Sequence, residues 1–140
     1  LWHQNFPLSK AMGLTVVSFT DHILTTRAPL LPNTNIHNTA FAGSLYAIEA
    51  MTAWGLLYLE IANAGLHASI IHARGDIDFA KTVNEDIVAV ADFSTLTYHI
   101  DELAESGKTR LTIAAKVQTK YGVASQFSGD YLARLERTDQ

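Results

Sequence analysis

Apolar residues cover almost the whole circumference of one long segment near the middle of the chain. At about 100 degrees per residue, the polar positions within residues 44–64 fall mainly on one narrow stripe. The stripe consists of Glu49, Thr52, Leu56, Glu60 and Asn63. Such a helix needs burial on nearly every side. Its two glutamates and the lack of basic flanks argue against a membrane span and favour a helix wrapped by a curved sheet.

Alternating apolar and polar positions predict strands on both sides of this helix. The predicted strands are residues 14–20, 22–30, 68–80, 87–94, 109–119 and 123–135, with short helices at 6–12 and 99–106. In the third strand, the residues expected to face the core are Ile71, Ala73, Gly75, Ile77 and Phe79. The residues expected on the outer face, as solvated ion pairs, are His72, Arg74, Asp76 and Asp78. This order of elements predicts an α+β fold.

Composition is compatible with one domain spanning residues 1–140. The chain has no cysteine, a net charge of −4 and a pI near 5.8. These values exclude disulfides and a cysteine nucleophile, and they provide no basic surface for nucleic acid or an anionic membrane. No histidine pair has helical i,i+4 spacing, so no metal site is expected. A cytoplasmic setting is expected. The start at Leu1 rather than Met leaves an upstream domain open.

The junction between a polar loop and the long helix is the expected place for chemistry. Residues 35–43 read NIHNTAFAG and lead directly into the helix. The first turn of a helix has unpaired backbone N–H groups and the positive end of the helix dipole, which suit a carbonyl oxygen that gains negative charge. The alternative is an ordinary buried helix capped by Ser44.

The same residues resemble a known family. The run from His37 to Tyr46, Gly55 on the helix and the run Asp78-Phe79-Ala80-Lys81 resemble hot-dog fold thioesterases, and more narrowly the YiiD C-terminal family of thioesterase-like domains. The resemblance implies a long central helix wrapped by a curved antiparallel sheet of five to six strands. It further implies an acyl-CoA or acyl-carrier substrate, no cofactor beyond that coenzyme A, and a homodimer or dimer of dimers. Some bacterial members follow a GNAT-type acetyltransferase domain.

The broader thioesterase motif is similar to Asn-x-x-Gly-x-x-His-Gly-Gly, followed by an acid about two turns into the helix. Its five defined positions are held here by Asn35, Asn38, Phe41, Ala42 and Gly43. Asn38 tolerates the left-handed backbone that a tight turn needs in place of glycine. The acid position is held by Ala50, and Glu49 lies one residue earlier, about 100 degrees around the helix.

The candidate site follows from these positions. The expected catalytic residues are Glu49, His37, Asn35 and Thr39, and the expected substrate-binding residues are Asn38, Phe41, Ala42, Gly43 and Ser44. Glu49 either activates water with a pKa raised by burial, or reaches a subunit interface with Glu60 and pairs there with Arg74 or a histidine. Asn35 is equally a turn former.

Three functions remain open from the sequence. The first is thioester hydrolysis, with backbone N–H groups near Gly43 polarising the carbonyl. The second is a dehydratase that uses His37 with Glu49. The third is a non-catalytic acyl-CoA-binding or dimerising module, which the alanine at position 50 favours.

Overall fold

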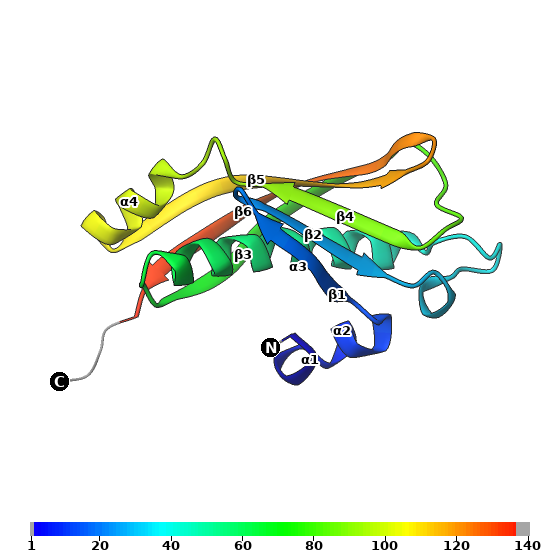
Figure 1. The fold of residues 1–140 in the computed structure, drawn as a ribbon, viewed down its shortest axis with the longest axis horizontal. Coiled ribbons are helices and arrows are strands. Elements are labelled where there is room, and N and C mark those ends of the chain that lie inside the picture. The colour runs from blue at the N-terminus through cyan, green and yellow to red at the C-terminus, as the bar shows by residue number, and fades with distance from the viewer. Residues whose placement is uncertain (1, 137–140) are drawn as a thin grey trace.

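The computed structural model describes residues 2–136 and consists of one long helix partly enclosed by a six-stranded sheet (Figure 1). The helices are α1 (Trp2–Asn5), α2 (Pro7–Met12), the 3-10 turn η1 (Leu31–Asn33), α3 (Ala42–Asn63) and α4 (Tyr98–Ser106). The strands are β1 (Thr15–Thr20), β2 (Ile23–Ala28), β3 (Ala68–Phe79), β4 (Ile87–Asp92), β5 (Lys108–Thr119) and β6 (Gly122–Leu135). The predicted elements are present with small shifts at their ends, and α1 and η1 are too short to show a period in the sequence.

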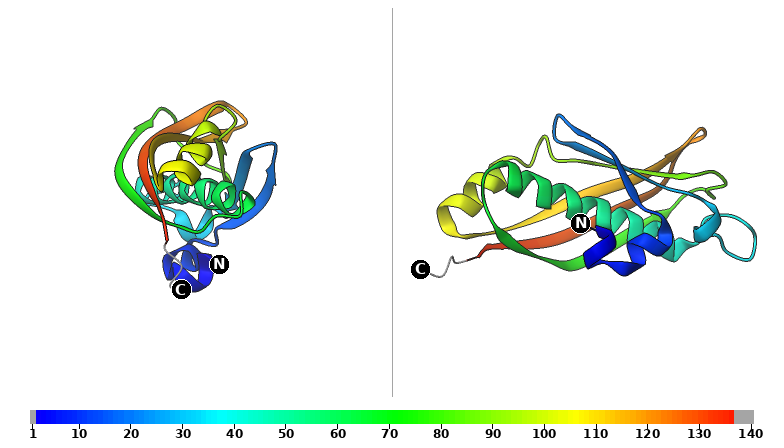
Figure 2. Two further views of the ribbon diagram at one scale, coloured as in Figure 1. Left: turned by 90° about the vertical axis from the view of Figure 1, so that its left-hand side faces the viewer. Right: turned by 60° about the horizontal axis from the view of Figure 1, so that its bottom comes forward.

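The sheet is antiparallel throughout, in the order β1-β2-β4-β5-β6-β3. It curls around α3, as the end-on view in Figure 2 shows, with α1 and α2 on the side that the sheet leaves open. This is the α+β hot-dog arrangement that the sequence predicts. The two edges of the sheet are the short strand β1 and the twelve-residue strand β3.

Except for Asn63 at its exposed end, the polar stripe of α3 faces the interior of its own chain. Glu49 and Thr52 are fully buried and Glu60 is almost so, together with the apolar residues of the same face. The expectation that the two glutamates reach a subunit interface is therefore wrong. By length and composition α3 could cross a membrane, but most of its apolar window is buried inside this fold. In the second half of α3, Trp54 is partly buried and Tyr58 is exposed.

The predicted faces of β3 are wrong along its first half because the strand contains a bulge. The register with β6 shifts between His72 and Arg74. Before the shift Ile71 is exposed, while the His72 ring stacks on the buried Tyr131 ring with 4.6 Å between centroids. The extra residue of the bulge shifts the alternation of side chains between the two faces of β3 by one position. After the bulge Ile77 therefore lies on its predicted face, partly buried against the core. β3 is thus an edge strand that contacts the interior through the His72 ring stacked on Tyr131.

Candidate functional site at the start of α3

The first turn of α3 carries free backbone donors. Phe41 precedes the helix in an extended conformation, and among the described residues no side chain caps this end. The N–H groups of Ala42, Gly43 and Ser44 have no acceptor within the helix, because an α-helix leaves its first donors unpaired. The N-cap position is held by Phe41 and Ser44 lies inside the first turn, so the expected cap at Ser44 is wrong. A Cβ at Gly43 would overlap the ring of Phe41, so the ring rests on the glycine and any larger residue would displace it.

The loop before the helix is held in shape by Asn35. Its Oδ1 accepts hydrogen bonds from the backbone N–H of His37 at 2.8 Å and of Thr39 at 3.2 Å, and its Nδ2 donates to Thr39 Oγ1 at 3.0 Å. Asn38 adopts φ 61°, the left-handed conformation in which asparagine replaces glycine at low cost. The His37 side chain is exposed. Asn35 and Thr39 therefore have a structural role in this turn, as the alternative interpretation of Asn35 predicts.

A cavity of about 280 Å³ opens beside this helix end. Its lining includes Asn35, Thr39, Ala42, Leu45 and Lys81, so the loop, the first helical turn and the segment after β3 meet there. The lining does not include His37, Asn38, Phe41, Gly43 or Ser44. The structure thus brings part of the predicted set together around one cavity.

Glu49 lies behind the wall of this cavity, on the core side. Leu45 lines the cavity from α3, and Glu49 is four residues later on the same face of the helix. On the sheet side, the carbonyl of Ala124 accepts the N–H groups of Ala80 and Lys81, which line the cavity, at 2.8 and 3.0 Å. The next residue, Ser125, donates its hydroxyl to Glu49 Oε2 at 2.8 Å.

The carboxyl group of Glu49 is only half satisfied. It is fully buried, and within residues 2–136 its Oε1 has no hydrogen-bond partner. Burial raises the pKa of Glu49 from 4.5 to about 7, and the hydrogen bond from Ser125 opposes part of this rise. A carboxyl group with a pKa near neutrality can both accept and return a proton at physiological pH.

Ser125 could not be identified from the sequence. It lies 76 residues from Glu49, on β6, and a serine in an alternating strand has no distinguishing signal. The expected acid position, Ala50, makes a backbone contact with the sheet. The backbone carbonyl of Ala50 accepts the hydroxyl of Tyr131 at 2.8 Å, so this part of the helix packs against β6.

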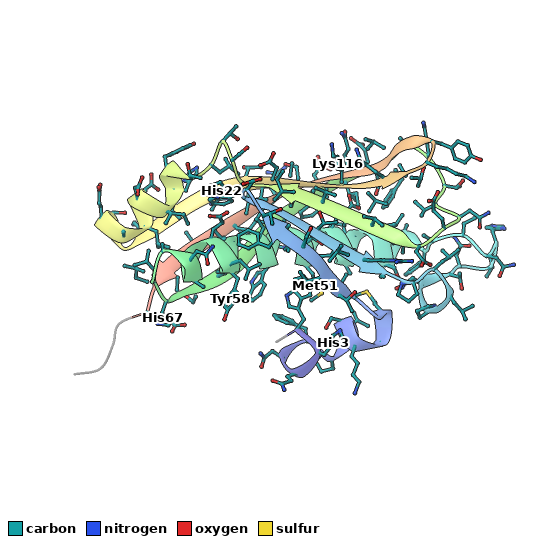
Figure 3. All side chains as sticks on the ribbon, viewed as in Figure 1. His3, His22, Met51, Tyr58, His67 and Lys116 are labelled. Carbon is teal, nitrogen blue, oxygen red and sulfur yellow. The ribbon has the colours of Figure 1, made fainter. Side chains whose placement is uncertain are left out.

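The second carboxylate of the stripe has a separate partner. Glu60 Oε1 lies 2.7 Å from His22 Nδ1, at the tip of the β1–β2 hairpin (Figure 3). His22 and Asp21 both have positive φ, at 66° and 53°, as a two-residue type I′ turn requires. Glu60 therefore pairs with a histidine of its own chain, at the far end of the helix from Gly43.

Comparison with known proteins agrees with this geometry. Residues 1–135 match the family described as "Putative thioesterase (yiiD_Cterm)". A protein of Shewanella oneidensis named a "putative thioesterase" is 28% identical, with a TM-score of 0.84 over 95% of this chain and 91% of its own. A Chlorobaculum tepidum protein of unknown function is 26% identical, with a TM-score of 0.88 over 96% of this chain and 90% of its own.

A third solved structure supports the fold alone. It is a Pseudomonas aeruginosa protein of unknown function named a "Probable Thioesterase", and it is 19% identical with a TM-score of 0.80. Its alignment covers 96% of this chain and 91% of that protein. With its central α3 helix, its antiparallel six-stranded sheet and a family match over residues 1–135, the chain belongs to the YiiD C-terminal family of hot-dog thioesterase-like domains.

Proposed function

We propose that this protein hydrolyses the thioester of an acyl-CoA or of an acyl carrier. The observation that carries the proposal is the uncapped start of α3 beside a cavity, with a buried carboxyl of pKa about 7 behind the cavity wall. Donors for a developing oxyanion and a group able to move a proton at neutral pH are the two parts that thioester hydrolysis by water requires.

In the proposed reaction, the thioester carbonyl oxygen lies against the free N–H groups of the first turn of α3, of whose residues Ala42 lines the cavity. Each such donor is worth roughly 3 to 4 kcal/mol in the transition state. Glu49 takes a proton from a water molecule as the water oxygen bonds to the carbonyl carbon. The carbon–sulfur bond then breaks, and Glu49 returns the proton to the leaving thiolate. The products are a carboxylic acid and a free thiol, and Glu49 ends in its starting state.

The cavity rim suits the arm that both possible carriers share. Coenzyme A and acyl carriers both present a thioester on a phosphorylated pantetheine arm. Lys81 lines the cavity, and its Nζ donates to the carbonyl of Tyr121 at 2.6 Å, which holds a cationic group at the rim. A cation there favours a phosphorylated arm of either kind. No cofactor apart from this substrate-borne arm is proposed, and the proposed setting is the cytoplasm.

We infer a homodimer that forms through β3. This edge strand presents a row of backbone donors and acceptors over twelve residues, with Ile71 57% and Phe79 49% exposed. Two antiparallel copies of one strand are self-complementary, and pairing would remove an edge that is otherwise open to aggregation.

The enclosure of Glu49 favours a second candidate, a module that binds acyl-CoA without hydrolysing it. Glu49 has no exposed surface, so water reaches its carboxyl group only if the cavity wall opens. In the binding module the same N–H groups hold the carbonyl in its ground state, and Glu49 remains a buried structural residue.

One panel of substrates separates these candidates. Acyl-CoA, enoyl-CoA and 3-hydroxyacyl-CoA are incubated with the protein while thiol release and hydration are both followed. For a thioesterase, Glu49→Gln is expected to lower kcat by at least about 100-fold. Glu60→Gln is the matched control, since Glu60 lies on the same helix face, three turns from Glu49, and is expected to retain activity. Binding without thiol release in the wild type would select the binding module.

A further inference from the structure

Three segments that are far apart in the sequence meet around the mouth of the cavity at the start of α3. Residues 35–39 and 79–83 both contribute lining residues. Lys81 joins them to the turn between β5 and β6, because its Nζ donates to the carbonyl of Tyr121 at 2.6 Å. Figures 1 and 2 show the three connections together at the end of the molecule where α3 begins. We call residues 35–39, 79–83 and 119–123 the mouth surface.

The mouth surface has the opposite charge to the whole chain. The sequence has 14 aspartates and glutamates against 10 lysines and arginines, a net charge of −4. The mouth surface instead contains Lys81 and Lys120, both exposed, and no aspartate or glutamate. The neighbouring acid, Glu85, accepts the backbone N–H of Lys120 at 3.4 Å, while the Lys120 ammonium lies 5.1 Å from the centre of the Tyr121 ring. An acidic partner is therefore attracted to this end of the molecule.

The mouth surface also exposes large apolar side chains beside its lysines. Ile36 is 92% exposed in the turn that Asn35 holds in shape, and Tyr121 is 72% exposed in the β5–β6 turn. Free coenzyme A carries its charges on a nucleotide and would leave an isoleucine outside the cavity without a partner. Exposed apolar groups with polar surroundings are typical of a surface that binds another protein.

We infer that the mouth surface docks an acyl-carrier protein with an acidic face, which delivers its acyl thioester into the cavity beside Ala42. The inference rests on the proposed function for the reaction, and it selects the protein carrier over free coenzyme A. Acidic side chains of the carrier meet Lys81 and Lys120, and its apolar residues pack on Ile36 and Tyr121. The phosphorylated arm of the carrier then enters past Lys81, which lines the cavity.

Kinetics with one acyl group on two carriers test the docking surface. The substrates are octanoyl-CoA and the octanoyl thioester of an acidic acyl-carrier protein. Ile36→Ser and Lys120→Glu change the mouth surface at exposed positions that do not line the cavity. The matched controls are Leu8→Ser, at a position 65% exposed on α2, and Lys108→Glu, at the opposite end of β5 from Lys120.

Both variants of the mouth surface are expected to raise KM for the octanoyl carrier at least about tenfold and to leave KM for octanoyl-CoA within about twofold, while the controls change neither. The KM of the wild type for the carrier should rise with salt, because salt screens the attraction to the lysines. Equal changes on both substrates, or no change on either, would overturn the inference. So would an Ile36→Ser protein whose sedimentation changes while its kinetics with the carrier do not, because Ile36 would then contact a second copy of the chain.

A binding measurement separates this inference from the proposed function. A carrier that bears an octanoyl amide in place of the thioester resists hydrolysis, and its affinity is measured by fluorescence anisotropy. Weaker binding to Ile36→Ser than to Leu8→Ser, without hydrolysis of either thioester, keeps the docking surface and refutes the proposed function. Hydrolysis of octanoyl-CoA without any binding of the amide carrier keeps the proposed function and refutes the docking surface.

Discussion

The buried carboxyl of Glu49 should make the stability of this protein fall as the pH rises through the range from 4.5 to 7. The pKa of Glu49 is about 7 in the folded chain and 4.5 for an ordinary glutamate. Between these values the folded state holds a proton that the unfolded state has lost. Because the unfolded state binds fewer protons there, the free energy of unfolding decreases with increasing pH.

The size of the effect follows from the displacement of the pKa. Each pKa unit corresponds to 1.36 kcal/mol, so a rise from 4.5 to about 7 removes about 3 kcal/mol of stability once the pH exceeds 7. That contribution is fully present below pH 4.5, where both states are protonated. Against a total stability of roughly 5 to 15 kcal/mol it is readily measurable.

Glu49→Gln isolates this contribution. The amide oxygen of glutamine can still accept the Ser125 hydroxyl, while its NH₂ group takes the place of the unpaired Oε1 and has no acceptor there. That unpaired donor lowers stability by about 1 to 3 kcal/mol at every pH. The informative quantity is therefore the difference in free energy of unfolding between Glu49→Gln and the wild type, followed as a function of pH. This difference should shift in favour of the variant by about 3 kcal/mol between pH 4.5 and pH 8.

The assay is urea unfolding followed by tryptophan fluorescence, from pH 4.5 to pH 8 at one protein concentration, because dimerisation makes apparent stability concentration-dependent. Glu102→Gln, which changes an exposed carboxyl on α4, is the matched control and should follow the wild type. Parallel stability curves for wild type and Glu49→Gln would show that Glu49 ionises in the fold as readily as in the unfolded chain, and the reasoning would fail.

Two further predictions concern the partners of the buried carboxyl groups. Ser125→Ala removes the only hydrogen bond to Glu49 within the described residues and should raise the pKa of Glu49 further. In a plot of kcat/KM against pH, the loss of activity at low pH should then begin at a higher pH than in the wild type. An unchanged pH profile would mean that another group determines it. His22→Asn keeps a residue that tolerates a positive φ but shortens the side chain that meets Glu60, and should lower the free energy of unfolding by about 1 to 3 kcal/mol in urea; wild-type stability would show that Glu60 is satisfied without His22.

The pKa of Glu49 connects stability and the proposed chemistry. The burial that destabilises the charged carboxyl also places its pKa where a general base works near neutral pH. Ser125 limits the rise in the pKa of Glu49, because its hydrogen bond stabilises the ionised form of the carboxyl group. Above neutral pH, Glu49→Gln is therefore expected to reduce turnover while its stability equals that of the wild type or exceeds it by up to about 2 kcal/mol.

The sequence by itself determined the order of elements, the central helix and the family. Each of these depends on local patterns: an apolar period around the helix, alternation along the strands, and a polar loop before Gly43. The tolerance of Asn38 for left-handed backbone is also a local property, and its φ of 61° accords with it. Local patterns suffice there because a helix and a tight turn are decided by neighbouring residues.

Only the tertiary structure decided what the polar stripe of α3 faces. Periodicity places Glu49 and Glu60 on one stripe, but it does not say whether a sheet or another subunit covers that stripe. The partner of Glu49 lies 76 residues away and that of Glu60 lies 38 residues away, so both contacts depend on how β6 and the β1–β2 hairpin fold back over the helix. The bulge in β3 shows the same limit: one extra residue exchanges the faces of Ile71 and His72. Pairing between distant strands sets side-chain direction with a period of two, so one shift of register reverses what alternation alone predicts.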